Sequence, residues 1–230
     1  MAMLNYEASM CNAFDRVVTM TREDAAFLRS YSPRANIRAI PIGIDADCFQ
    51  PVRDTSPNQP ARVLFVGNFR HPPNVEAAQF LIDEVATHFR EIEFIIAGSY
   101  VPETLEKLPN VSFPGYVPDT RALFQTPNTI FAAPLFSGTG QRVKLLEAFA
   151  MEAAVVTTTV GAFGFPIENG KQAMIADKAE DFRTAVGSLV GSPRLRSQLG
   201  KDARQMIVSQ FTWKTIGRQF LDLVQESGRG

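Results

Sequence analysis

The chain has 230 residues, of which 45% are hydrophobic, so it can bury a large core in one or one and a half average domains. The 23 basic and 24 acidic residues nearly cancel, which removes the electrostatic argument for nucleic-acid binding. Two cysteines are too few for a disulfide framework, and neither a signal-peptide pattern nor an apolar run of membrane-spanning length is seen. We therefore expect a cytoplasmic protein without a transmembrane segment.

Runs of β-type residues alternate with helix-period segments along the chain. Strands are predicted at 16–20, 37–40, 62–66, 92–97, 111–113, 130–133, 154–158 and 173–175. Helices are predicted at 22–30, 74–88, 102–107, 119–125, 142–147, 179–190, 193–209 and 212–225, and a linker or surface loop at 54–60. This alternation predicts an α/β fold, a Rossmann-like parallel sheet with helices on both faces.

Glycine-containing turns follow four of the predicted strands. They are Gly67-Asn68, Gly98-Ser99, Gly115-Tyr116 and the Ser-Gly-Thr-Gly loop 137–140. Because ligands of open parallel sheets bind at the carboxyl ends of the strands, we expect these turns to converge on one edge. The loop is not a dinucleotide fingerprint, because it lacks the third small residue and comes too late for a first strand-to-helix turn.

The helix behind that loop carries the best candidate for a phosphate site. Unpaired N–H groups and the positive dipole end at a helix start suit an anion. Lys144 and Glu147 are three residues apart and share one helix face. Glu147 lies about 10 Å along the helix from Gly140, at roughly 1.5 Å per residue, so it could meet a sugar hydroxyl while the helix start holds a diphosphate.

The segment PLFSGTGQRVKLLEAFAMEAAVVTTTVGAFGF (134–165) resembles the signature of retaining glycosyltransferases with the GT-B fold, of the glycosyl transferases group 1 type. The resemblance extends from about residue 16 to residue 224. Further motifs at consistent spacing carry it: PIGID and FQP at 41–51, VGN at 66–68, IIAGS at 95–99, VSFPGYV at 111–117 and FTW at 211–213.

The resemblance implies that the chain is the donor-binding domain of an enzyme that moves a sugar from a nucleoside diphosphate sugar to an acceptor hydroxyl, in polysaccharide or glycan assembly. Residues 1–50 would be the tail of a missing N-terminal acceptor domain plus a linker. Residues 51–210 would form the nucleotide-sugar domain, and 211–230 a helix that crosses back. We expect no metal and no cofactor besides the donor, and no transfer by this chain alone. The full-length protein could still contact a membrane surface peripherally.

The resemblance also implies roles for individual residues. Lys144, Glu147 and Arg70 are the expected catalytic residues: Glu147 accepts hydrogen bonds from the ribose, Lys144 contacts the diphosphate, and Arg70 replaces basic residues that relatives have near the first glycine turn. The expected donor-binding residues are Gly67, Asn68, Gly98, Tyr116, Val117, Gly138, Thr139, Gly140, Arg142, Lys144 and Glu147.

Four positions depart from the family pattern. Thr139 stands where relatives carry a second glutamate on the donor sugar, and Asn68 and Pro73 stand where many carry Arg and Lys on phosphate. Glu152 replaces a glycine after the helix, so we expect that helix end to differ.

These departures leave two alternatives open: a non-catalytic nucleotide-binding or interaction module, and a nucleotide-sugar epimerase of GT-B fold, against which the segments LLEA and VVTTTVGAFG argue. An acceptor-domain tail without its sheet would expose apolar surface, which predicts self-association.

Overall fold

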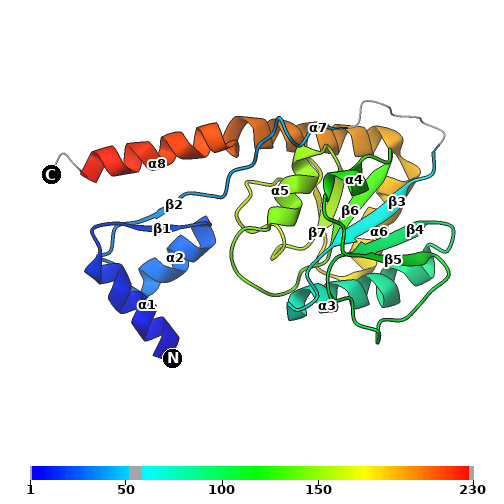
Figure 1. The fold of residues 1–230 in the computed structure, drawn as a ribbon, viewed down its shortest axis with the longest axis horizontal. Coiled ribbons are helices and arrows are strands. Elements are labelled where there is room, and N and C mark those ends of the chain that lie inside the picture. The colour runs from blue at the N-terminus through cyan, green and yellow to red at the C-terminus, as the bar shows by residue number, and fades with distance from the viewer. Residues whose placement is uncertain (1, 52–58, 228–230) are drawn as a thin grey trace.

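A computed structural model of the chain describes residues 2–51 and 59–227, in two units of different size (Figure 1). The large unit holds a six-stranded sheet in the order β5-β4-β3-β6-β7-β8, and every pair of neighbouring strands is parallel. Its strands are β3 (Arg62–Val66), β4 (Glu93–Ala97), β5 (Val111–Gly115), β6 (Thr129–Ala133), β7 (Ala154–Thr157) and β8 (Met174–Ile175).

The central strands are apolar because helices cover both faces of the sheet. All five residues of β6 and all four of β7 are buried. Such continuous burial is typical of a parallel sheet. The largest fully buried side chains include Phe65, Phe94, Phe131 and Phe149, which come from three strands and one helix of this unit.

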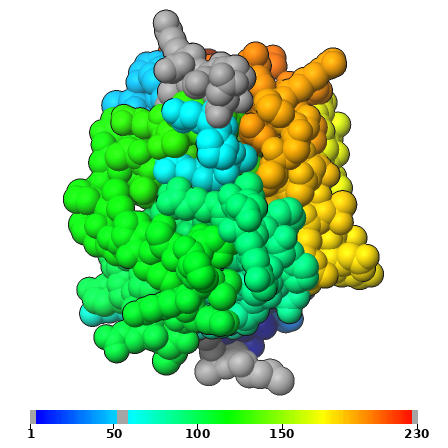
Figure 2. Space-filling view, turned by 90° about the vertical axis from the view of Figure 1, so that its right-hand side faces the viewer, coloured from blue at the N-terminus to red at the C-terminus, as the bar shows by residue number. Residues whose placement is uncertain are grey.

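The helices of the large unit follow the strands in the alternation that the sequence predicts. They are α3 (Pro72–Phe80) with a π-helical turn (Leu81–Val85) and a 3-10 turn (Ala86–His88), α4 (Arg121–Phe124), α5 (Val143–Ala150), α6 (Ala179–Gly191) and α7 (Pro193–Gln210). At the end of the molecule away from the small unit, α6 and α7 lie along one side of the surface and the segment around β5 along the other (Figure 2).

The small unit contains α1 (Ala2–Ala13), β1 (Val17–Thr19), α2 (Arg22–Tyr31) and β2 (Ile37–Ala39), with β1 and β2 paired in parallel. The C-terminal helix α8 (Trp213–Ser227) leaves the large unit and runs along the small one (Figure 1). There Ile216 and Leu223 pack with Ile40, and Glu226 accepts from Arg16 at 2.9 Å. The helix therefore ties the two units together.

The parallel sheet with helices on both faces is confirmed, while several predicted element boundaries are wrong. Residues 102–107 form a turn closed by a 3.3 Å bond from the Leu105 N–H to the Pro102 carbonyl, not a helix. The helix predicted at 74–88 begins two residues earlier, because Pro72 and Pro73 fit its first turn, and it ends in π and 3-10 turns. Helix α1 was not predicted. The linker predicted at 54–60 lies mostly outside the described residues.

The expectation that the end of α5 would differ because of Glu152 is also wrong. Glu152 adopts the left-handed conformation, with φ 56°, that glycine usually supplies. Helix α7 packs against this turn so closely that a Cβ on Gly200 would lie 2.1 Å from the Glu152 carbonyl oxygen. Tertiary packing therefore holds Glu152 in a conformation that local preference opposes.

Within residues 2–51 and 59–227, no helix is both long and apolar enough to cross a bilayer.

Candidate functional site

Three of the four glycine turns lie in direct contact at the carboxyl edge of the sheet. The Gly67 N–H donates to the Ala97 carbonyl at 2.9 Å, and the Gly98 N–H donates to the Gly115 carbonyl at 2.8 Å. A Cβ on Gly98, whose φ is +141°, would lie 1.7 Å from the Gly67 carbonyl oxygen. Only glycine fits at position 98, and the expected convergence of these turns is confirmed.

Arg142 organises the fourth turn, the loop 137–140. Its guanidinium donates to the Thr139 carbonyl at 2.6 Å and to the Ser137 carbonyl at 3.3 Å. Gly138 has φ +102°, and a Cβ there would lie 3.2 Å from the Arg142 guanidinium. Burial lowers the pKa of Arg142. The structure thus places Arg142 on the loop backbone, and its expected contact with a diphosphate stays a prediction.

Lys144 stands in the first turn of α5, with its ammonium turned toward α3. The Nζ atom donates to Asn74 Oδ1 at 2.5 Å and lies 4.7 Å from the centre of the Phe65 ring. Burial is the main cause that lowers the pKa of Lys144 to about 7; the Arg142 charge acts in the same direction and Glu147 against it.

Glu147 lies one turn further along α5 and is half-buried. Its Oε2 atom accepts a hydrogen bond from the Thr120 hydroxyl at 3.1 Å, at the start of α4. Burial raises the pKa of Glu147, whereas the Thr120 bond acts in the opposite direction. Lys144 and Glu147 thus share a helix face, as predicted, but each hydrogen-bonds a different neighbour.

Arg70 lies on the turn after β3 and stacks on an aromatic ring. Its guanidinium carbon is 3.8 Å from the centre of the Tyr100 ring, and the backbone N–H of Arg70 donates to Asn68 Oδ1 at 3.1 Å. Tyr100 has φ 61°. The side chains of Tyr100 and of Tyr116 on the next turn are exposed, while Val117 is half-buried. The structure brings Arg70 to the same edge as Gly67 and Gly98.

Two residues of this edge were missed by sequence reasoning. Asn74 and Thr120 are the hydrogen-bond partners of Lys144 and Glu147. Asn74 is a buried polar residue in the first turn of α3, directly after the Gly67 turn, and that position is the only sequence signal for it.

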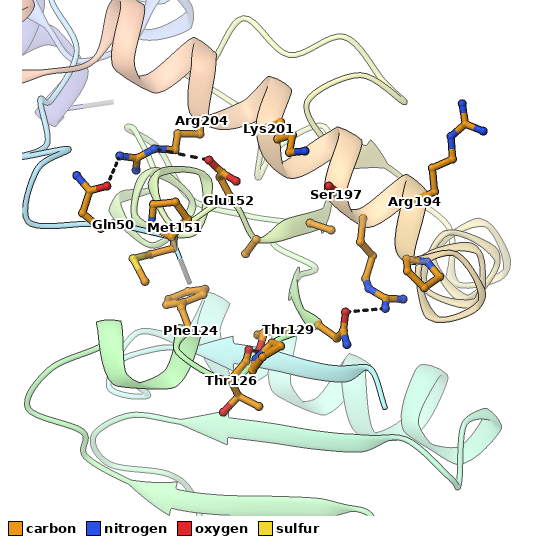
Figure 3. Close-up of a pocket in the computed structure, with 17 residues that line it drawn as sticks. Gln50, Phe124, Thr126, Thr129, Met151, Glu152, Arg194, Ser197, Lys201 and Arg204 are labelled. Carbon is orange, nitrogen blue, oxygen red and sulfur yellow. Dashed lines mark hydrogen bonds and ion pairs between the residues drawn. The ribbon is translucent and has the colours of Figure 1, made fainter. Parts of the chain in front are cut away.

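A groove lies at the opposite edge of the sheet. This groove of about 790 Å³ runs between α7 and the amino ends of β6 and β7, with Arg194, Ser197 and Lys201 on its α7 side (Figure 3). Arg204, also in its wall, is bonded to the Ala150 and Phe49 carbonyls. The groove is therefore separate from the glycine turns. In the part of the chain that the structure describes, no cluster of His, Cys, Asp or Glu could hold a metal ion.

The chain is similar to a curated protein, a phosphatidyl-myo-inositol mannosyltransferase of Mycolicibacterium smegmatis. It is 25% identical over 203 residues, which cover 83% of this chain and 52% of that protein. The chain thus spans about half the length of the curated relative that it matches.

Solved structures share the fold at low sequence identity. Alr3699/HepE of Anabaena, in complex with UDP and glucose, superposes with a TM-score of 0.82 at 16% identity, over 96% of this chain and 66% of that one. Sucrose-phosphate synthase of Thermosynechococcus elongatus gives 0.81 at 20% identity, over 98% and 61%. The fold is therefore the Rossmann-like half of a GT-B fold.

The family model described as glycosyl transferases group 1 matches residues 60–192, from just before β3 to the end of α6. This match covers more than half of the chain and contains all three turns in contact, the loop 137–140 and α5. The chain therefore belongs to the glycosyl transferases group 1 family.

Proposed function

We propose that this chain is the donor-binding half of a retaining glycosyltransferase, which moves a sugar from a nucleoside diphosphate sugar to an acceptor hydroxyl. One observation carries the proposal: Lys144 and Glu147 lie one helical turn apart on α5, at the edge where the glycine turns meet. A cation and a carboxylate at this spacing suit a diphosphate and the adjoining ribose.

Each group has a chemical role in the proposed reaction. Lys144, the start of α5 and Arg70 stabilise the negative charge of the leaving diphosphate. Glu147 accepts hydrogen bonds from the ribose hydroxyls, as a carboxylate can. Gly115, Tyr116 and Val117 read the nucleobase through their backbone, and Thr139 reaches the donor sugar with a hydroxyl. Arg142 acts through the loop backbone that it holds.

The relatives support a nucleotide sugar as donor and a glycan or glycolipid as product. HepE has been solved with UDP-glucose, and the curated relative is named for transfer of mannose to phosphatidyl-myo-inositol. We propose that residues 1–50 belong to an acceptor domain, that 51–210 bind the donor in the cytoplasm, and that 211–230 link the two. The acceptor domain would supply the acceptor half of the site and any peripheral membrane contact.

Calorimetric titration of the chain with UDP, GDP and ADP tests the donor site. We expect one of the three to bind, and Glu147→Ala to weaken that binding at least about tenfold, since a hydrogen bond to a charged group contributes about 1.5–3 kcal/mol. Glu91→Ala is the matched control, because Glu91 is exposed and lies before β4, at the amino edge of the sheet. A folded chain that binds none of the three nucleotides would contradict the proposal.

The alternative is a non-catalytic module that binds nucleotide without transferring sugar. Thr139 and Asn68 favour this alternative, because both are neutral residues at positions where relatives carry a glutamate and an arginine, respectively. A full-length protein that binds the nucleotide but leaves every nucleoside diphosphate sugar intact would support this alternative. The family match favours a transferase over an epimerase.

A further inference from the structure

The side chain of Asn74 connects the turn after β3 to helix α5. Its amide Nδ2 donates to the Asn68 carbonyl at 2.7 Å, and its Oδ1 accepts from Lys144 Nζ at 2.5 Å. The latter bond joins residues 70 positions apart in the chain. Asn74 is only 9% exposed, and both polar atoms of its side chain bond to other protein groups rather than facing solvent. The Asn68 carbonyl can only accept a hydrogen bond and the Lys144 ammonium can only donate one. The Asn74 amide therefore fits in one orientation, with Nδ2 toward Asn68 and Oδ1 toward Lys144.

The surroundings of Asn74 fix the position of the amide. A Cβ on Gly67 would lie 3.0 Å from the Asn74 Cγ atom, so a side chain at position 67 would displace the amide. The Phe65 ring lies 4.7 Å from Lys144 Nζ. The Lys144 ammonium is therefore confined between an aromatic face and a single amide oxygen.

A neutral partner has a specific electrostatic consequence. An amide oxygen orients the ammonium without cancelling its charge, whereas a carboxylate at the same place would form an ion pair and compete with a bound anion. The other charged groups that act on Lys144 are Arg142, which repels it, and Glu147, which attracts it. Asn74 is therefore suited to keep the positive charge available to a ligand.

We propose that Asn74 is a positioning residue that holds the Lys144 ammonium toward the donor diphosphate. This inference rests on the proposed function, because it takes the carboxyl edge as the donor site. It adds a residue for which the sequence supplied no role. It also places an oriented lysine of α5 next to the segment from the Gly67 turn to the start of α3. In that segment, Asn68 and Pro73 stand where many relatives carry basic residues.

The affinity ratio between a nucleoside diphosphate and its monophosphate tests the inference. The probe pair is UDP and UMP, GDP and GMP, or ADP and AMP, according to which diphosphate binds. We expect Asn74→Ala to lower the ratio at least about tenfold, because Lys144 loses its fixed position against the outer phosphate. Glu147→Ala should weaken both ligands alike. Asn169→Ala is the control, since Asn169 is exposed and also has one side-chain bond to the backbone, at 2.8 Å.

A second readout is the pKa of the Lys144 amine, measured by ¹³C-lysine NMR with Lys144→Arg for assignment. This pKa would not change if Asn74 only supported the fold. We expect Asn74→Ala to lower this pKa further, because the ammonium loses its acceptor, and the isosteric Asn74→Asp to raise it. Asn74→Asp should also lower the diphosphate-to-monophosphate ratio, which keeps the test valid if Asn74→Ala fails to fold.

The two proposals fail in different ways. If the wild-type chain binds a nucleotide but folded Asn74 variants keep the wild-type ratio and Lys144 pKa, the role of Asn74 is overturned and the donor site stands. If the wild-type chain binds none of the three diphosphates, the proposed function fails, and the role of Asn74 is overturned with it.

Discussion

At the scale of single residues, the candidate site holds two ionisable groups that burial drives toward their neutral forms. Burial lowers the pKa of Lys144 to about 7 and raises the pKa of Glu147. Each has one neutral hydrogen-bond partner, Asn74 or Thr120. A site that withholds water from a lysine in this way favours an anionic ligand, which restores the stability of the charged form.

Lys144 makes the stability of the chain depend on pH. Its pKa is about 7 when folded and near 10.5 when unfolded, so the unfolded state binds more protons between these values. The free energy of unfolding should therefore rise as the pH rises from 7 toward 10.5, by up to about 1.4 kcal/mol per pH unit. Chemical denaturation across this range measures the slope.

Lys144→Met, which keeps the length of the side chain without the charge, should flatten that slope. Lys201→Met is the control, because Lys201 is an exposed lysine on α7. Wild-type and Lys144→Met curves that run parallel from pH 7 to 10.5 would show that Lys144 is not desolvated in the folded chain.

At the scale of secondary-structure elements, the contact between α5 and α7 sets the end of the helix that carries Lys144 and Glu147. Gly200 allows α7 to approach the Glu152 carbonyl. Arg204, on the same helix, donates to the Ala150 carbonyl at the last residue of α5 and to the Phe49 carbonyl at 2.6 Å. Helix α7 thereby caps α5 and fixes its position against the sheet.

The left-handed backbone conformation of Glu152 lowers the stability of the folded chain, and a glycine at this position would remove that strain. We expect Glu152→Gly to be more stable than Glu152→Ala by about 1 kcal/mol, because only glycine adopts φ 56° without strain. Both variants lose the ion pair between Glu152 and Arg204, whose atoms are 3.8 Å apart. The difference in stability between the two variants therefore reports the backbone strain alone. Urea unfolding of the pair measures it, and equal midpoints and slopes would contradict the strain.

At the scale of the whole molecule, the small unit is a two-stranded parallel sheet with two helices. Large apolar side chains are exposed on this unit and on α8, which runs along it: Tyr6, Phe14, Val18, Met20, Phe27, Tyr31, Trp213, Phe220, Leu221 and Val224. Parallel sheets are normally covered on both faces, so this surface is suited to contact with further protein.

We expect this exposed apolar surface to make the chain self-associate. Light scattering after size-exclusion chromatography should give an average mass that rises with concentration. The double variant Phe220→Ser and Leu221→Ser should weaken the association, because both side chains are at least half exposed on α8. Arg218→Ser, an exposed change on the same helix, is the control. A monodisperse monomer over the whole concentration range would contradict the expectation.

Local sequence was sufficient for most strands and for the side of the sheet that holds the candidate site. The apolar runs at 63–66 and 130–133 predict buried parallel strands, because a short run of consecutive apolar residues is typical of a strand that is covered on both faces. The glycine turns predict the edge because carboxyl ends of parallel strands meet there. Lys144 and Glu147 share a face because helix geometry alone places residues three apart together.

Tertiary structure decided what these residues touch. The Lys144–Asn74 and Glu147–Thr120 bonds join residues 70 and 27 positions apart, and no local pattern specifies such pairs. Packing against α7 likewise imposes the left-handed Glu152, and the carbonyls of loop 137–140 turn Arg142 inward. Short-range preferences select helix, strand and turn, but long-range contacts select the partner, the burial and hence the pKa of each site residue.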